Sequence, residues 1–389
     1  MKKFLLALSA VICAAAPLGA QNAAFDQLAG GDSAAPQQAP VPAPAPVSGG
    51  TLTIYAYPPY RPINWATPRS ALKGVAATVF DQAVAEGPRV NFVSDFGESG
   101  SMPRNYRSSI GHTITHVNCT LPDGKPYDAW TSFSGQDFHQ VDKGNLLDKE
   151  LGMGVLFQDY IDGHIISGEQ NRLLLIYYQN VDGARPRYWE QKIDGQGCAR
   201  VRDMVVFFKS FHFPKGSTLE QLKARPTSRT LYFTSSIDPY RSYMARKLDP
   251  EASVGGGCAP YGLGLLKAAH KYDYTLDDVL TLRLQVSERL IGGIPDGHGG
   301  VRRVPVLSLL GKLGDSWTWP GYKNREFRNY DPSLIWKFIG GVDACLTGGA
   351  GCTPEASAWL SANRGRVSAG PAQNPNSSLP PHLQGIIVD

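Results

Sequence analysis

The N-terminal segment constrains this chain most, because it decides the compartment in which the rest of the chain folds. A lysine pair precedes an apolar run over residues 4–16, and small residues follow at Gly19 and Ala20. This order is typical of a secretory signal, and the run is too short to span a bilayer. We therefore expect residues 1–20 to be a signal peptide and the protein to be exported: periplasmic, cell-envelope-associated or extracellular.

Cysteine usage follows from this compartment, since oxidising surroundings favour disulfides. Five cysteines come after residue 20, and an odd number leaves at least one outside the intrachain pairs. Cys345 and Cys352 enclose a Gly-rich loop that lets them bridge, and Cys119 with Cys198 is the next pairing we expect. On this hypothesis Cys258 is the remaining cysteine. Spacing alone does not fix the connectivity.

The charge balance argues against one class of partner. The chain has 38 Lys plus Arg against 34 Asp plus Glu, and loss of Lys2 and Lys3 with the signal leaves 36 against 34, a net charge of +2. Phosphate binding needs basic residues concentrated on one face, and no such cluster is visible. We expect no nucleic-acid partner and no transmembrane segment.

Composition divides the chain into four parts. Residues 21–50 are rich in Pro, Ala and Gln, with prolines in near alternation, which is typical of an extended linker. Residues 51–365 have the mixed composition of a globular domain. Residues 366–389 lose hydrophobic periodicity and contain several prolines, so we expect an irregular tail.

Hydrophobic patterning within the globular part predicts an α+β fold, a small antiparallel sheet packed against helices. The turn at residues 122–124 joins two of the expected strands. The expected strands cover residues 51–57, 110–117, 127–133, 154–157, 164–167 and 173–179. The expected helices cover residues 70–85, 198–209, 217–223 and the run that follows Cys258, and a helix or strand is expected from residue 275 to 290.

Two motifs combine residue types that carry chemistry. His112 follows a glycine at the start of an expected strand, and Cys258 follows three glycines at the start of an expected helix, where Pro260 is tolerated. A thiol at a helix N-terminus meets the positive end of the helix dipole and backbone donors, which favour the thiolate and provide an oxyanion site. These are the requirements of a cysteine nucleophile.

This arrangement resembles the circularly permuted branch of the papain-like superfamily, which includes the NlpC/P60 hydrolases and the lecithin:retinol acyltransferase-like enzymes. In that branch a histidine opens a strand, a polar residue lies on the next strand, and the cysteine comes later at a helix start. The resemblance implies that His112 is the general base for Cys258. It also implies an orienting third residue, for which Asp128 is our first candidate and Thr131 and Ser132 are the others.

Other histidines offer weaker alternatives. His298 follows Cys258, as an unpermuted papain-like order requires, but its glycine-rich surroundings indicate a hairpin turn. His112 and His116 share one face of a strand and could begin a metal site, but no third ligand is near in the sequence. We expect neither a metal nor a cofactor.

Together these features predict an exported thiol hydrolase that cleaves an amide or (thio)ester bond. The family resemblance implies a cell-wall peptide or an acylated lipid or lipoprotein as substrate. Two alternatives stay open. One is a lipid or lipoprotein acyltransferase that uses the same Cys-His pair, and the other is a non-catalytic, disulfide-stapled envelope-binding protein in which Cys258 belongs to a loop.

Overall fold

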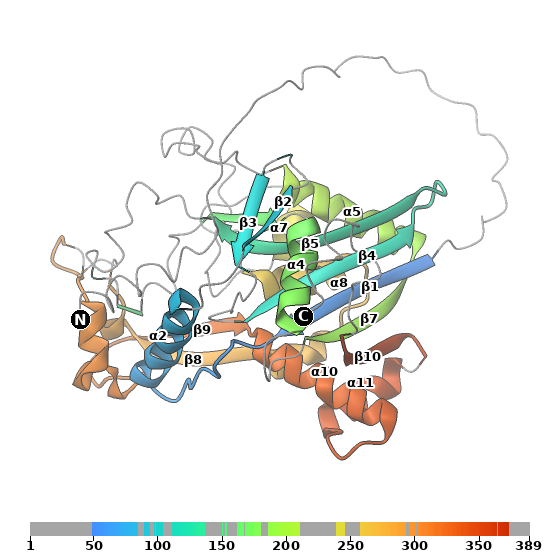
Figure 1. Ribbon diagram of the computed structural model, residues 1–389. Helices are drawn as coiled ribbons and strands as arrows, with labels where there is room; N and C mark the ends of the chain where they lie inside the picture. The colour runs from blue at the N-terminus through green and yellow to red at the C-terminus, as the bar shows by residue number, and fades with distance from the viewer. Residues whose placement is uncertain are drawn as a thin grey trace, which may run out of the picture.

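The structure is a computed structural model, and it confirms the α+β class with an antiparallel sheet. Ten strands and the helices between them are described (Figure 1). The described residues are 49–84, 89–93, 97, 99–103, 111–136, 150, 152–153, 162–166, 168–179, 186–210, 239–245, 257–292, 296–300, 302–363 and 365–372.

Strands form one six-stranded sheet and two two-stranded sheets. The large sheet has six strands in the order β10-β7-β1-β4-β5-β6, and all its neighbours are antiparallel. The two smaller sheets pair β2 with β3 and β8 with β9. The strands are β1 (Gly49–Tyr57), β2 (Arg89–Val93), β3 (Ser99–Pro103), β4 (His112–Thr120), β5 (Pro126–Gln136), β6 (Asp162–Ile166), β7 (Arg187–Asp194), β8 (Thr281–Ser287), β9 (Asn324–Tyr330) and β10 (Val367–Pro371).

Helices separate these strands and cover the large sheet on both faces. None of the helices in the described part of the chain is long and apolar enough to cross a membrane. The α-helices are α2 (Pro68–Val84), α4 (Gly168–Gln179), α5 (Gly195–Lys209), α7 (Pro239–Ala245), α8 (Cys258–Ala268), α9 (Asp277–Leu280), α10 (Pro332–Thr347) and α11 (Pro354–Asn363). The 3-10 helices are η4 (Tyr274–Leu276), η5 (Glu288–Leu290), η6 (Val306–Leu310) and η7 (Lys312–Asp315).

The main core lies on one face of the six-stranded sheet, between the sheet and helices α5, α8, α10 and α11. Side chains alternate along a strand, so every second residue faces this core. Leu52 and Ile54 of β1, Val117 of β4 and Trp189 of β7 are at most 2% exposed there. The rings of α10 and α11 pack edge-on against Trp189. Helix α4 lies across the opposite face, in front of the sheet in Figure 1.

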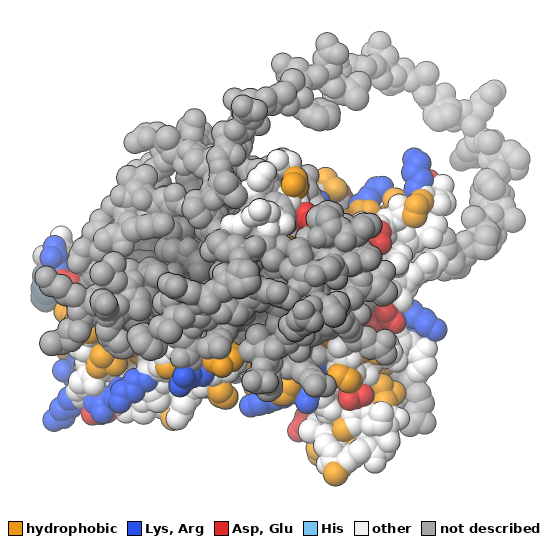
Figure 2. All heavy atoms as spheres, viewed as in Figure 1, with side chains coloured by type: hydrophobic (Ala, Val, Ile, Leu, Met, Phe, Trp, Pro, Cys, Tyr) orange, Lys and Arg blue, Asp and Glu red, His pale blue; other side chains and the backbone are white. Residues whose placement is uncertain are grey.

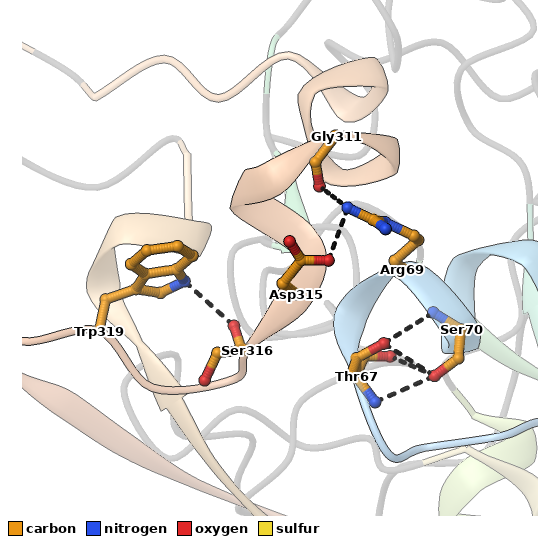
Figure 3. A network of polar contacts seen from close by, with 7 residues as sticks. All are labelled: Thr67, Arg69, Ser70, Gly311, Asp315, Ser316 and Trp319. Atoms are coloured by element: carbon orange, nitrogen blue, oxygen red, sulfur yellow. Dashed lines mark hydrogen bonds and ion pairs between the residues drawn. The ribbon is translucent and has the colours of Figure 1, made fainter.

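A second, smaller core joins α2 to the β8–β9 pair and the segment that contains η6 and η7. Thr67 caps α2, because its hydroxyl accepts a hydrogen bond from the Ser70 N–H at 3.1 Å. The Ser70 hydroxyl in turn accepts one from the Thr67 N–H at 3.0 Å. Arg69 reaches from this turn to the Gly311 carbonyl and the Asp315 carboxylate (Figure 3). Along the lower edge of Figure 2, where this part lies, Lys and Arg side chains are spread among hydrophobic ones.

Most of the expected elements are confirmed. The helix or strand expected over residues 275–290 is a short helical turn followed by β8 and η5. Four further expectations lie outside the described residues: the strand at 154–157, the helix at 217–223, the signal peptide at 1–20 and residues 21–48 of the expected linker. The strands expected at 51–57, 110–117, 127–133 and 164–167 correspond to β1, β4, β5 and β6, and the helices expected at 70–85, 198–209 and after Cys258 correspond to α2, α5 and α8.

The strand expected at residues 173–179 is the clearest error, because these residues belong to helix α4. Leu173, Leu174 and Leu175 are all at most 5% exposed. A short apolar run has the same appearance in a buried strand and a buried helix, and periodicity does not separate them. The helix turns Asn171 toward the sheet, which matters for the site below.

The C-terminal segment also differs from expectation. Part of the tail expected to be irregular over residues 366–389 forms β10, which pairs with β7 at the edge of the sheet. Ala369 faces the core opposite Trp189, and Pro371 ends the strand at its edge. Proline is tolerated on an edge strand, because the missing N–H has no ladder partner to lose. Residues 373–389 lie outside the described part.

Both expected disulfides are confirmed. Cys119 of β4 is bonded to Cys198 of α5, and Cys345 is bonded to Cys352 at the end of α10. The first bond lies in the core, where Cys198 is fully buried, while Cys352 is exposed. Cys258 is in neither bond.

We expect the two disulfides to contribute unequally to stability. The first joins residues 79 apart and the second residues 7 apart, so loop-closure entropy gives about 4.5 against about 2.5 kcal/mol. Denaturant unfolding of the paired variant Cys119→Ala/Cys198→Ala should show the larger loss, with Cys345→Ala/Cys352→Ala as its matched control. Equal losses in the two variants would contradict this assignment.

Candidate functional site

Helix α8 places Cys258 at a defined end of the sheet. Near the start of the helix, a Cβ on Gly262 would lie 3.5 Å from Thr115 Cγ2, so this turn packs directly on β4. At the other end, the Ala268 carbonyl accepts from Arg200 Nε at 2.8 Å, and Arg200 belongs to the part of α5 that is bonded to the end of β4 through Cys198. The helix therefore runs in the same direction as β4. Its first residue lies toward the end where β4 begins.

The backbone before Cys258 explains the glycine run. Gly257 has φ 52° and ψ −174°, and it precedes the helix without a side-chain cap. This conformation is almost restricted to glycine. It lets the chain enter α8 so that Cys258 is its first residue. The Cys258 side chain is buried, with 5% of the residue exposed.

His112, the first residue of β4, belongs to a buried hydrogen-bond chain. Its Nε2 lies 3.1 Å from Ser132 Oγ, and Ser132 Oγ lies 2.7 Å from Asn171 Oδ1 of α4. Asn171 Nδ2 donates to the Ile166 carbonyl at 3.2 Å, which fixes the amide orientation because a carbonyl only accepts. Ser132 must then donate to Asn171 and accept from His112. The chain assigns the proton of His112 to Nε2 and leaves Nδ1 as the basic nitrogen.

Burial decides the charge of His112. The residue is 8% exposed, and desolvation lowers its pKa to about 3. No charged group counteracts this among the causes of the shift. His112 is therefore a neutral imidazole over the physiological range, held in one tautomer by Ser132 and Asn171.

His112 and α8 lie on opposite faces of the sheet. His112 shares its face with Ser132 and α4, whereas Gly262 of α8 packs on Thr113 and Thr115. Strand alternation accounts for this, because neighbouring residues point to opposite faces. Among the described residues no hydrogen bond joins His112 to Cys258. The structure brings the two residues to the same end of the sheet but on opposite faces of it.

The three candidates for the orienting residue have three different partners. Asp128 bonds to His116, with Oδ1 2.9 Å from Nε2. Thr131 faces the core and lies 3.0 Å from the hydroxyl of Tyr261 in α8. Ser132 is the one that contacts His112. The structure thus places Ser132, rather than Asp128, where an orienting residue for His112 belongs.

His116 has a separate environment. Its ring stacks on Trp130 at 4.2 Å between centroids, and its pKa is lowered mainly by burial, which outweighs the contact with Asp128. His298 lies far along the chain in a loop where Asp296 accepts from backbone N–H groups, and it is exposed. Within the residues that the structure describes, no group of three His, Cys, Asp or Glu side chains could hold a metal ion.

Two residues of this site were not found from the sequence. Asn171 lies in the segment that was expected to be a strand, so its side chain had no predicted neighbour. Thr113 lies next to His112 in the sequence, but its side chain faces α8. The alternation of side chains along β4 was the signal that could have assigned His112 and Thr113 to opposite faces of the sheet.

Comparisons with known proteins add no relationship. No family model, no curated protein and no solved structure matches this chain. The resemblance to the permuted papain-like branch therefore rests on the residues named above.

We expect opposite effects from alanine at two glycines of the α8 start. Gly257→Ala should lower the free energy of unfolding by about 1–3 kcal/mol, because alanine is strained at this φ and ψ. Gly262→Ala is the matched control: its Cβ would make ordinary contacts at 3.5–3.9 Å, and alanine favours the helix by up to about 1 kcal/mol. Denaturant unfolding measures both, and destabilisation by Gly262→Ala alone would refute the assigned geometry.

Burial of neutral His112 predicts a loss of stability in acid. Between its ordinary pKa of 6.5 and the folded pKa of about 3, the unfolded chain binds a proton that the folded chain does not. The free energy of unfolding should therefore fall as pH drops through this window, by up to about 1.4 kcal/mol per pH unit for one proton. His112→Gln, which keeps a donor for Ser132, should flatten the slope. The exposed His298→Gln is the control, and an unchanged slope in His112→Gln would contradict the burial.

Proposed function

We propose that the protein is an exported thiol hydrolase in which Cys258 attacks an amide or (thio)ester carbonyl and His112 serves as the base. One observation carries the proposal. The cysteine outside both disulfides begins a helix packed on the sheet, at the same end of the sheet where β4 begins with a neutral, tautomer-fixed histidine.

The helix start supplies the nucleophile's environment. Backbone N–H groups of a first helical turn point out of the helix, and the helix dipole puts partial positive charge there. Both favour the thiolate form of Cys258 and the oxyanion that forms when it adds to a carbonyl. Pro260 in this turn has no N–H, so the donors are those of the residues around it.

His112 supplies the base through Nδ1. In the proposed reaction Nδ1 takes the thiol proton, sulfur forms a bond to the carbonyl carbon, and the tetrahedral adduct expels the amine, alcohol or thiol, which receives that proton. Water then hydrolyses the resulting thioester. The proton transfer requires Nδ1, which lies on the opposite face of the sheet from α8, to come within reach of Cys258 directly or through one water in the substrate complex.

The substrate class follows from the family resemblance alone. It is a cell-wall peptide or an acyl group on a lipid or lipoprotein. If an acceptor other than water takes the acyl group from the thioester, the same pair makes the protein an acyltransferase. Peptide release from purified cell wall supports the hydrolase, and acyl transfer from phospholipid vesicles supports the transferase.

Brief alkylation with iodoacetamide at mildly acidic pH, followed by mass spectrometry of the folded mature protein, tests the proposal. Ordinary thiols with a pKa of about 8.5 react slowly under these conditions, whereas an activated thiolate reacts fast. We expect rapid labelling at Cys258 and slower labelling in His112→Ala.

The matched control is His116→Ala, which removes the same side chain from the same strand on the same face. It should leave the labelling of Cys258 unchanged. If wild-type Cys258 reacts no faster than an ordinary thiol, the catalytic pair is refuted and the non-catalytic envelope-binding alternative replaces it. If the two histidine variants slow labelling equally, His112 is not the base.

A further inference from the structure

A tight turn at residues 319–322 carries two aromatic side chains at the end of the β8–β9 pair. Its sequence is Trp-Pro-Gly-Tyr, and the Tyr322 N–H donates to the Trp319 carbonyl at 3.3 Å. Pro320 in the second position and Gly321 with φ 80° in the third are typical of a type II turn. A Cβ added to Gly321 would meet no atom within 4 Å. The tip of the turn therefore projects into open space.

The two rings of this turn hold one guanidinium group. Arg289 Cζ of η5 lies 4.5 Å from the centre of the Trp319 ring and 5.4 Å from that of Tyr322. Trp319 is itself fixed, because its Nε1 donates to the Ser316 carbonyl at 3.1 Å (Figure 3). Arg289 is exposed, and its guanidinium takes part in no ion pair or hydrogen bond within the described part of the chain. A stacked guanidinium with unused donors is suited to binding a phosphate group.

Positive charge gathers around the turn. Two carboxylates lie among the basic groups: Glu288, which bonds to Arg325 at 2.9 Å, and Asp296, whose charge interacts with Arg302. Four cations against two acids leave an excess of two positive charges, which equals the net charge of the whole mature chain. Figure 2 shows Lys and Arg beside hydrophobic side chains along the edge where this part lies. The four basic residues are Arg289, Arg302, Lys323 and Arg325.

We infer that this surface, formed by Trp319, Tyr322 and the four basic residues, docks the protein on a bilayer that contains anionic phospholipid. Trp and Tyr rings have an apolar body and a polar tip, and they favour the headgroup level of a membrane. Tyr322 is 43% exposed, so it reaches that level without unfolding. The cations beside it meet the lipid phosphates. A projecting turn also suits a flat partner, and this inference does not depend on the reaction proposed for Cys258.

Cosedimentation of the full mature chain with lipid vesicles tests the inference. We expect binding to vesicles of phosphatidylcholine mixed with phosphatidylglycerol, little binding to phosphatidylcholine alone, and weaker binding at high salt. Each cation near an anionic leaflet contributes about fivefold, so Arg289→Gln/Lys323→Gln should weaken binding about 25-fold. Tyr322→Ala should also weaken binding, and Tyr322→Phe, which keeps the ring, should not.

The matched control is Arg283→Gln/Arg328→Gln, which removes two exposed positive charges from the same pair of strands. These residues lie directly opposite each other, about 13 Å along the strands from the end that carries the turn. The control should bind like wild type. Equal losses in the two double variants would show general charge attraction and overturn the inference. If Arg289→Gln/Lys323→Gln does not fold, the difference between Tyr322→Ala and Tyr322→Phe decides.

Two further outcomes would overturn the docking surface. One is wild-type protein that does not bind mixed vesicles. The other is retention on heparin without vesicle binding, which would assign the surface to an acidic polymer. Labelling of Cys258 by iodoacetamide should be the same in wild type and both double variants. Failure of vesicle binding therefore leaves the proposed function standing, and an unreactive Cys258 leaves the docking surface standing.

Discussion

The packing of α8 between the sheet and α5 is the contact on which the rest of the structure depends. Every residue of the helix is buried, and two glycines allow its close approach on opposite sides. Gly262 packs on β4, and a Cβ on Gly264 would lie 2.8 Å from Met204 Cε of α5. The Cys119–Cys198 bond then ties α5 to the end of β4, so the sheet and the two helices form one unit. The position of Cys258 follows from this packing.

Lys267 shows how the buried helix also accommodates a charge. Its residue is 4% exposed, and Nζ lies 3.2 Å from the Tyr330 hydroxyl and 4.9 Å from the centre of the Tyr272 ring. Asp277 accepts from both tyrosine hydroxyls at 2.6 Å. A buried ammonium needs such partners, because an unpaired charge in the interior is costly. This network joins the end of α8 to β9, so it connects the main core to the second core.

Local signals in the sequence were enough for much of the fold. The turn at residues 122–124 predicted the β4–β5 hairpin, and the apolar spacing predicted α5 and α8. The expected compartment favoured disulfides, the Gly-rich loop indicated the Cys345–Cys352 pair, and Cys119–Cys198 was the next pairing expected. The signals failed where distant contacts decide the structure. The apolar run from Leu173 to Leu175 is compatible with a strand as well as with a helix. Strand β10 pairs with β7, where Ala369 lies opposite Trp189, and these two residues are far apart along the chain. Helices α10 and α11 were not among the expected elements.

The candidate site was only partly predictable for the same reason. Cys258 and His112 were found from their glycine-flanked motifs, and Ser132 was one of three candidates for the third residue. Choosing Ser132 over Asp128 requires the β4–β5 register and the position of Asn171 on α4. Placing Cys258 at the His112 end of the sheet requires the direction of α8 along β4. Neither can be read from the chain before the sheet and helix are placed.

The central claim is that Cys258 is a thiolate nucleophile rather than a buried structural cysteine. The most direct test follows the ultraviolet absorbance of the thiolate while the folded mature protein is titrated, with Cys258→Ala subtracted as background. Both disulfides remain intact, so the difference reports this one residue. The account predicts an apparent pKa well below the value of about 8.5 of an ordinary thiol. A pKa at or above that value, as apolar burial alone produces, would contradict it.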